Sequence, residues 1–371
     1  MQLGKSFRIL QKPSAEDVPA SVTEFLVQLD GPAVIKLDGR DKRRCRFVVT
    51  LLHGNEPSGL KAIHQLLRED FEPEVDTYLA IVSVEAALTE SQFSHRYLPG
   101  QRDMNRLFTP PYSDAQAMLA AELLDIIRRV EPEAVIDLHN TSGDGPAFAV
   151  AVEEQPIHMD IAILFTHRLI ITDIRLGALM ESEGLGCPVV TIECGGAAQA
   201  LSDTIARQGL KRFMTEAELA RPMLPDSEKL AERDIYRHPV RMELKPAGSL
   251  CYAEEPCPDM DITLPLHLDR RNFGIVGPDS PLAWLSGQGI RNLRVVDAHG
   301  HDVIDEYFVS REGKLYPRTF LKLFMVTTNP SIAVSDCIFY AVKEVDHTHL
   351  QTTRMTLDSI DSGARDYSDR K

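Results

Sequence analysis

The sequence has few cysteines, a deficit of basic residues and no long apolar run. Its 6 cysteines are scattered, and no two of them have the Cys-x-x-Cys spacing that is typical of redox or zinc-ribbon modules. Forty basic residues face 55 acidic ones, which gives a formal net charge of −15. Clustered Lys and Arg hold phosphate backbones and anionic membranes, so this balance argues against a nucleic-acid or membrane binder. A small anionic substrate stays compatible with it, because a few arginines in one pocket are enough to bind one.

Segments that lead to or cross a membrane are also missing from the sequence. No stretch approaches the roughly 18 apolar residues that a span requires, and the first residues lack the apolar segment of a secretory signal. We therefore expect a soluble, cytoplasmic protein, and the sequence leaves open whether it forms a homo-oligomer. The composition is that of a globular protein, with 43% hydrophobic and 26% charged residues. At roughly 150 residues per domain, 371 residues predict two domains.

Four short apolar runs are typical of strands that are buried on both faces: 47–53, 77–84, 134–139 and 189–193. Helical periodicity lies between them, over 57–70 and from a capping box at Ser113 and Gln116 to about Val130. Strands that alternate with helices predict an α/β fold with a mostly parallel or mixed sheet flanked by helices. In such folds the functional residues gather at the carboxyl ends of the strands.

The sequence pattern changes near residue 235. Helical periodicity fades there, Pro and Gly become frequent, and short β-type runs such as 292–297 and 320–326 appear. We therefore expect a catalytic domain over 1–235, a smaller β-rich domain over 236–345 and a polar tail over 346–371.

Polar side chains follow two of the predicted strands and are typical of a metal site. His53 and Glu56 form the single His-x-x-Glu of the chain, a spacing that can bring an imidazole and a carboxylate to one ion, with Gly54 permitting the turn. His139, at another strand end, would complete a His2Glu set with one open coordination position, as in catalytic zinc sites. Asp137 lies on the same face of that strand and is expected to orient the imidazole of His139. The alternatives are an accidental spacing and a satisfied Asp–His pair at the sheet rim.

A third strand end carries Glu193, which the proposed ligand set does not need. A carboxylate near a metal-activated water is what a hydrolase requires as a general base. Between the first two strand ends, Asn105 stands next to Arg106, and this pair suits a carboxylate of the substrate. The alternative is a structural turn with Arg106 in a surface ion pair.

Four motifs in this order, His-Gly-x-Glu, Asp-x-Asn-Arg-x-Phe, Asp-Leu-His-Asn and Pro-x-x-x-x-Glu, cover roughly residues 45–200. Together they resemble the succinylglutamate desuccinylase/aspartoacylase family, relatives of the zinc carboxypeptidases. The resemblance implies a carboxypeptidase-like α/β domain followed by a smaller β-rich domain. The residues that it assigns are the zinc ligands His53, Glu56 and His139, the proton-transferring Glu193, and the substrate-binding Asn105 and Arg106.

Two further family positions match less well. The family has an arginine, in an Arg-Tyr pair, that helps to polarise the scissile carbonyl; Arg96-Tyr97 is the matching pair, and Arg102 competes for the role. Tyr316 is our choice for the tyrosine of the C-terminal domain that closes over the substrate in aspartoacylases. The residues that recognise the acyl group in the two enzymes that name the family have no match in this sequence, so the acyl group and the amine of the substrate stay undetermined.

The motifs thus predict a zinc-dependent hydrolase that cleaves an amide or ester bond in a small, carboxylate-bearing N-acyl compound. One alternative is a peptide-cleaving metallocarboxypeptidase, which would use the same metal ligands and the same anchor for a carboxylate. The other is a non-catalytic, zinc-binding module that senses an acidic metabolite.

Overall fold

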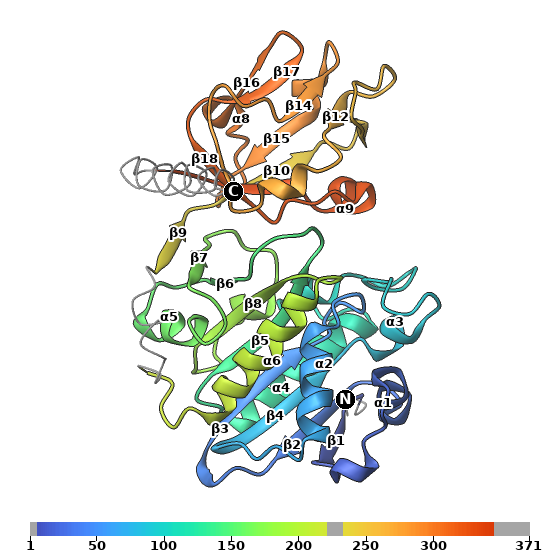
Figure 1. Ribbon diagram of the computed structural model, residues 1–371, viewed down its shortest axis with the longest axis vertical. Coiled ribbons are helices and arrows are strands. Elements are labelled where there is room, and N and C mark those ends of the chain that lie inside the picture. The colour runs from blue at the N-terminus through green and yellow to red at the C-terminus, as the bar shows by residue number, and fades with distance from the viewer. Residues whose placement is uncertain (1–5, 221–232, 345–371) are drawn as a thin grey trace, which may run out of the picture.

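The computed structural model describes residues 6–220 and 233–344, so the predicted tail lies outside the described residues. Strands between residues 8 and 237 form one nine-stranded sheet, and strands between 240 and 343 form two five-stranded sheets (Figure 1). Of the helices in the described ranges, none has both the length and the apolar character for a membrane crossing. The predicted fold class, a helix-flanked α/β sheet followed by a β-rich region, is confirmed.

The large sheet is mixed. Its strands in spatial order are β1 (Arg8–Gln11), β2 (Ala33–Leu37), β4 (Val75–Ile81), β3 (Asp41–Thr50), β5 (Val135–Thr141), β8 (Val189–Gly196), β6 (Phe148–Ala151), β7 (Arg168–Ile171) and β9 (Asp234–Arg237). Neighbouring strands are parallel except at β2–β4 and β6–β8. The four apolar runs correspond to β3, β4, β5 and β8, which are adjacent in the middle of the sheet. Their two buried faces explain why these runs are almost continuously apolar.

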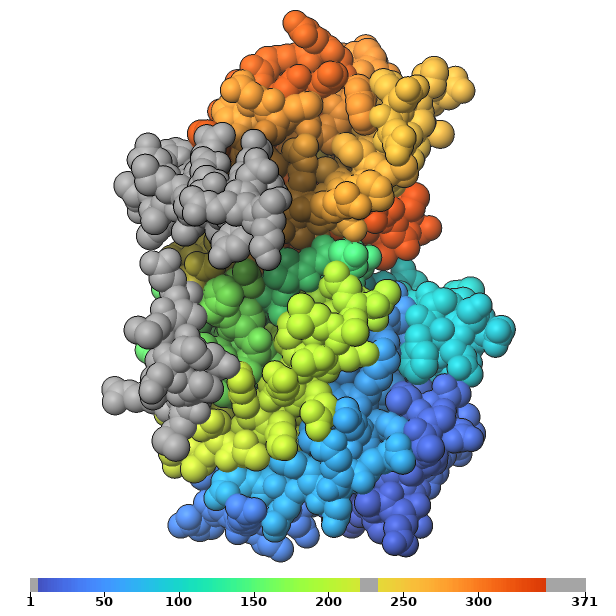
Figure 2. Space-filling view, viewed as in Figure 1, coloured from blue at the N-terminus to red at the C-terminus, as the bar shows by residue number. Residues whose placement is uncertain are grey.

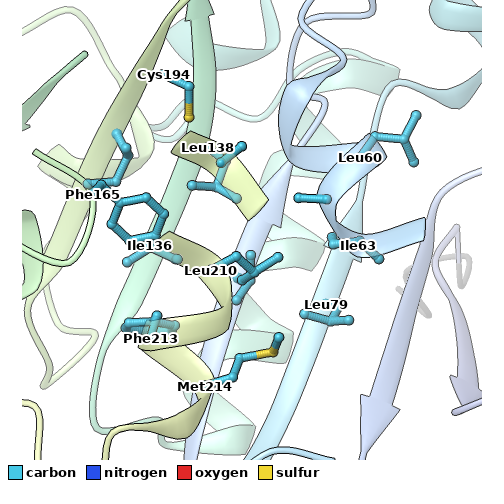
Figure 3. Close-up of a cluster of buried hydrophobic side chains, with 14 of the residues drawn as sticks. Leu60, Ile63, Leu79, Ile136, Leu138, Phe165, Cys194, Leu210, Phe213 and Met214 are labelled. Atoms are coloured by element: carbon cyan, nitrogen blue, oxygen red, sulfur yellow. The ribbon is translucent and has the colours of Figure 1, made fainter. Parts of the chain in front are cut away.

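Helices cover both faces of this sheet. They are α1 (Val22–Leu29), α2 (Ser58–Arg68), α3 (Val84–Leu88), α4 (Ala115–Val130), α5 (Pro156–Ala162) and α6 (Ala200–Thr215). On one face, α2 and α6 lie side by side and bury Ile63, Leu210 and Phe213 against Ile136 of β5 (Figure 3). Short 3-10 helices span Ala15–Asp17, Met104–Arg106, Leu179–Glu181, Leu268–Arg271 and Gly289–Asn292.

Helix α4 covers the opposite face, where Leu123 and Ile127 pack with Phe47 and Val49 of β3. The predicted capping box at its start is wrong. Asp114 caps the helix instead, because its carboxylate accepts a hydrogen bond from the backbone N–H of residue 117 at 2.9 Å.

The C-terminal region contains two small sheets around its own apolar core. The first has the order β13 (Ile275–Val276), β18 (Leu321–Phe324), β19 (Phe339–Lys343), β10 (Val240–Leu244) and β15 (Leu293–Val296). The second has the order β11 (Leu250–Tyr252), β12 (Ile262–Leu264), β14 (Ala283–Leu285), β17 (Lys314–Pro317) and β16 (Phe308–Arg311). Two short helices, α8 (Ile304–Tyr307) and α9 (Pro330–Ser335), complete the region.

An apolar cluster joins the two regions, and Figure 2 shows the C-terminal region seated on one end of the larger one. Phe148 and Ile170 of the large sheet pack there with Phe324 and Tyr340 of the C-terminal region. The boundary between two domains at residue 235 remains a proposal. Strand β9 crosses that position and still pairs with β7 in the large sheet.

Candidate active site

Two of the predicted metal ligands lie in the turn between β3 and α2. The backbone N–H of Glu56 donates to the carbonyl oxygen of His53 at 3.2 Å. Gly54 is required here by close packing, because a Cβ at this position would lie 2.7 Å from the carbonyl oxygen of His95. The N–H of Gly54 also donates to the carbonyl oxygen of Arg96 at 3.0 Å, which fixes the backbone of that arginine beside the turn.

His139, from β5, completes the predicted ligand set. The carboxylate oxygens of Glu56 lie 2.8 Å from Nδ1 of His53 and 2.6 Å from Nδ1 of His139. All three side chains are buried, and their potential ligand atoms lie within 4.8 Å of one another. Two imidazole nitrogens and a carboxylate are a donor set that suits zinc and leaves further coordination positions open. The residues present therefore fit a divalent metal ion.

The other nitrogen of each imidazole meets a second carboxylate. Asp137 lies 2.7 Å from Nε2 of His139, as the two-residue spacing along the strand predicts, and Asp103 lies 2.9 Å from Nε2 of His53. Such contacts set the tautomer and the orientation of metal-ligating histidines. Burial acts to lower the pKa of His139, but the carboxylates of Asp137 and Glu56 raise it well above its ordinary value. The site therefore favours positive charge at this position.

Negative charge is concentrated around the cluster. The carboxylates of Glu56, Asp103, Asp137 and Glu193 are largely buried, and Asp137 Oδ1 and Glu193 Oε2 have no hydrogen-bond partner among the described residues. Arg96 faces this group, with its guanidinium 3.3 Å from Glu56 Oε1 and 2.9 Å from Asp103 Oδ2. A bound divalent cation would offset much of the remaining negative charge.

Glu193 lies directly beside His139, because β5 and β8 are parallel and these two residues are paired in the register. Burial raises the pKa of Glu193 from its ordinary value to about 7. The carboxylate can therefore hold or release a proton near neutral pH, next to the candidate metal ligands.

Asn140 is a residue of the site that the sequence analysis missed. Its side chain accepts from the backbone N–H of Ser58 at 3.0 Å and donates to the carbonyl oxygen of Gly195 at 2.9 Å. Its own backbone N–H donates to Glu56 Oε2 at 3.2 Å. Asn140 thus connects the ends of β5 and β8 with the start of α2, and its place directly after His139 was the available signal. Asp103 was missed in the same way, as a motif residue to which no role was assigned.

Asn105 and Arg106 both reach the site, with part of their hydrogen-bonding capacity used inside the protein. Asn105 Oδ1 accepts from the backbone N–H of Leu179 at 3.0 Å, and its Nδ2 lies 3.5 Å from His139 Nε2. Arg106 donates to Asp336 of the C-terminal region at 3.3 Å. Arg106 is thus at the predicted place and already has a carboxylate partner.

The structure does not bring Arg102 or Tyr316, two of the residues predicted to bind substrate, to the cluster. Arg102 is half-exposed and pairs with Asp114 at the start of α4, with Nε 2.6 Å from the carboxylate. Tyr316 is on β17, at the end of the C-terminal region that lies away from the large sheet (Figure 1). Its ring stacks under Arg311, 4.3 Å from the guanidinium carbon to the ring centroid.

The cluster opens into a small cavity of about 70 Å³ between the two regions. Arg96 and Glu193 line it together with the three candidate ligands, and the C-terminal region contributes Met325, Ile332 and Asp336. The C-terminal region therefore covers the carboxyl edge of the large sheet.

A helix-flanked mixed sheet with a buried His-Glu-His cluster at its carboxyl edge defines an α/β protein with a candidate metal centre. Residues 47–217 match the family model described as the succinylglutamate desuccinylase/aspartoacylase catalytic domain. This match confirms the resemblance drawn from the four motifs. A comparison with curated proteins gives no significant match.

Solved structures of similar proteins share the fold. A succinylglutamate desuccinylase from Vibrio parahaemolyticus has a TM-score of 0.55 and 14% identity, over 88% of this chain and 96% of its own. Murine aminoacylase 3 has a TM-score of 0.50 and 18% identity, over 83% and 97%. The product-bound ectoine utilization protein of Ruegeria pomeroyi has a TM-score of 0.50 and 17% identity, over 84% and 88%. At these identities the likeness concerns the fold alone.

Proposed function

We propose that this chain is a zinc-dependent hydrolase that cleaves the amide, or an ester, of a small carboxylate-bearing N-acyl compound. The observation that carries the proposal is the position of Glu193 next to His139, as a buried carboxylate whose Oε2 has no hydrogen-bond partner in the described part of the chain. Beside it, His53, Glu56 and His139 converge as a donor set for a divalent ion. The match of residues 47–217 to the succinylglutamate desuccinylase/aspartoacylase catalytic domain supports the same reaction class.

His53, Glu56 and His139 would hold the zinc ion. When bound there, zinc supplies a Lewis acid that makes water more acidic and polarises a carbonyl group. Asp103 and Asp137 keep the two imidazoles in the orientation that presents Nδ1 to Glu56.

Glu193 is proposed to move the proton. Its carboxylate accepts a proton from the attacking water and then donates it to the leaving amine nitrogen. Burial raises the pKa of Glu193 and a bound cation lowers it, and a value between these two effects suits a group that must take up and release a proton at the same pH. A glutamine at this position could do neither.

Arg96 is proposed to stabilise the negative charge that develops on the carbonyl oxygen. Its guanidinium lies on the wall of the cavity and is held by Glu56 and Asp103, so it needs little reorganisation during the reaction. Arg106, with Asn105 beside it, is proposed to anchor the substrate's carboxylate, for which it would exchange part of its contact with Asp336.

The two alternative functions make different predictions. A metallocarboxypeptidase needs room for a long chain, whereas Met325, Ile332 and Asp336 cover the cavity from the C-terminal side. Short peptides should therefore be poorer substrates than free N-acyl amino acids. A non-catalytic sensor should bind zinc and an acidic ligand without turnover.

The test combines metal analysis of the purified protein with a hydrolysis screen of N-acetyl, N-succinyl and N-formyl amino acids. We expect about one zinc per chain and turnover of at least one class. Glu193→Gln should retain zinc and lower kcat by about 10² to 10⁴. Glu85→Gln, on the exposed side of α3, is the matched control and should behave like the wild type. A protein that cannot acquire a divalent metal, or a Glu193→Gln variant with full activity, would refute the proposal.

A further inference from the structure

A second cavity of about 80 Å³ lies behind the candidate active site. Asn105, Arg106, Glu193 and Met325 line both this cavity and the one that contains the metal ligands. A substrate whose scissile bond lies beside Glu193 would therefore have one of its ends next to this second cavity.

The walls of the second cavity are mainly apolar. Its apolar lining includes Val150, Ile170, Ile174, Met180, Phe324 and Met325. The first two come from β6 and β7 of the large sheet, and the last two come from the C-terminal region, so the cavity exists only where the two regions meet. By volume it has room for roughly five to eight water-sized groups.

The charged groups of this cavity do not favour an anion. Among the described residues that line it, Arg106 is the one cation, and it already pairs with Asp336. Glu181 uses its carboxylate to accept the backbone N–H groups of residues 176 and 177 at 2.8 to 3.0 Å. Together with Glu193 it adds negative charge, which would repel a second carboxylate. The hydroxyl groups of Thr172, Thr191 and Tyr340 are the other polar side-chain groups here, apart from the Asn105 amide.

We infer that this cavity selects an apolar group of four to six carbons or an aromatic ring on one side of the scissile amide. This inference rests on the proposed function, because it assigns part of the same substrate. The carboxylate of the substrate would lie at Arg106, and the apolar group would extend past Glu193 between β7 and Phe324. Dicarboxylic acyl groups such as succinyl, and acidic amines such as aspartate, would be poor substrates, since the described lining of the cavity offers no unpaired cation for their second charge.

Two series of substrates distinguish which side of the amide enters the cavity. In the first, glycine is kept and the acyl group changes from acetyl to butyryl, hexanoyl, phenylacetyl and succinyl. In the second, acetyl is kept and the amino acid changes from glycine to leucine, phenylalanine and aspartate. Burial of each additional methylene is worth about fourfold, so the four carbons added from acetyl to hexanoyl, or from glycine to leucine, should raise kcat/KM roughly 250-fold along one series. The acidic member of that series should have a lower kcat/KM.

Ala178→Leu fills the cavity from its wall, where Ala178 is 5% exposed. It should remove the advantage of the large apolar group and leave the N-acetylglycine rate nearly unchanged. Ile174→Ala enlarges the cavity and should shift the preference to longer groups, so the inference can be tested if one variant does not fold. Ala200→Leu, at an exposed position on α6, is the matched control.

A binding measurement separates this inference from the proposed function. Isothermal titration of the zinc-loaded protein with acetate, hexanoate, succinate, leucine and aspartate requires no turnover. The inference is supported if hexanoate or leucine binds more tightly than acetate, succinate and aspartate, and if Ala178→Leu weakens this binding. If every hydrolysis assay is negative while this result holds, only the proposed function fails. A preference for succinate or aspartate, or an equal loss for all ligands in Ala178→Leu, overturns the inference.

Discussion

Asp103 offers the sharpest test of how the candidate metal site is held. Its Oδ1 lies 2.9 Å from His53 Nε2, and its Oδ2 accepts from Arg96 Nε at the same distance. Burial acts to raise the pKa of Asp103, but His53 and Arg96 lower it far below its ordinary value. The carboxylate is therefore ionised and keeps the proton of His53 on Nε2, which leaves Nδ1 to face the metal position.

Removing such an orienting carboxylate weakens metal binding about 10- to 100-fold in known sites. We expect Asp103→Ala to lie near the upper end of this range, about 2.7 kcal/mol, because the alanine removes both the charge and the hydrogen-bond acceptor. Asp103→Asn should lie near the lower end, since the amide oxygen still accepts a hydrogen bond from Nε2. Asp137→Asn makes the equivalent change at His139, where the carboxylate is fully buried.

The assay is competition for zinc between the protein and a chromophoric chelator of known affinity. Asp125→Asn, a partly exposed carboxylate on α4 that accepts from Arg128, serves as control and should keep the wild-type affinity. Circular dichroism of each metal-free variant shows whether the fold is intact. An unchanged zinc affinity in folded Asp103→Ala would refute the role that the contact with His53 implies.

Four further outcomes are expected. Arg96→Ala should lower kcat about 10²- to 10³-fold and retain zinc, whereas Arg102→Ala, its control, should leave kcat unchanged. If steady-state kinetics show the same kcat for both variants, Arg96 has no part in the mechanism. Burial raises the pKa of Glu193 from 4.5 to about 7, and a bound cation lowers it. Because the base must be deprotonated, kcat/KM should rise with pH, with an apparent pKa between 4.5 and 7. A kcat/KM that does not change over this pH range contradicts Glu193 as the base. Asp336→Asn should lower KM for carboxylate-bearing substrates, because the charged side chain of Asp336 would no longer compete with the substrate for Arg106. An increased KM in initial-rate assays would argue against Arg106 as the anchor of the substrate's carboxylate. Zinc at 1,000 times its Kd should stabilise the fold by about 4 kcal/mol, and an unchanged Tm in a chelator titration would exclude tight binding.

The sequence by itself determined the centre of the sheet and the core of the candidate site. Strands β3, β4, β5 and β8 are buried on both faces, so their apolar runs were visible without the fold. His53, Glu56, His139 and Glu193 could be located as well, because they stand at or just after the carboxyl ends of these strands, where functional residues gather. The contact between Asp137 and His139 followed from the two-residue period of a strand.

Tertiary structure alone decided which loop residues reach the cluster. The Arg-Tyr pair favoured Arg96, and Arg102 in the same loop competed with it. In the structure the N–H of Gly54 donates to the backbone carbonyl of Arg96, while Arg102 pairs with Asp114. The contact of Asp103 with His53 depends on the same loop path. No local periodicity encodes where a loop of this kind passes.

The C-terminal region shows the same limit over a longer distance. Its β-rich character followed from Pro, Gly and short apolar runs. The sequence does not tell which end of that region faces the site, and the structure places Tyr316 away from the cluster. The partner of Arg106 is Asp336, 230 residues away, and the apolar cavity combines Val150 with Phe324. Short-range sequence patterns indicate burial and secondary structure, whereas contacts between distant segments depend on how the two regions pack. That packing decided the partner of Arg106 and the lining of the apolar cavity.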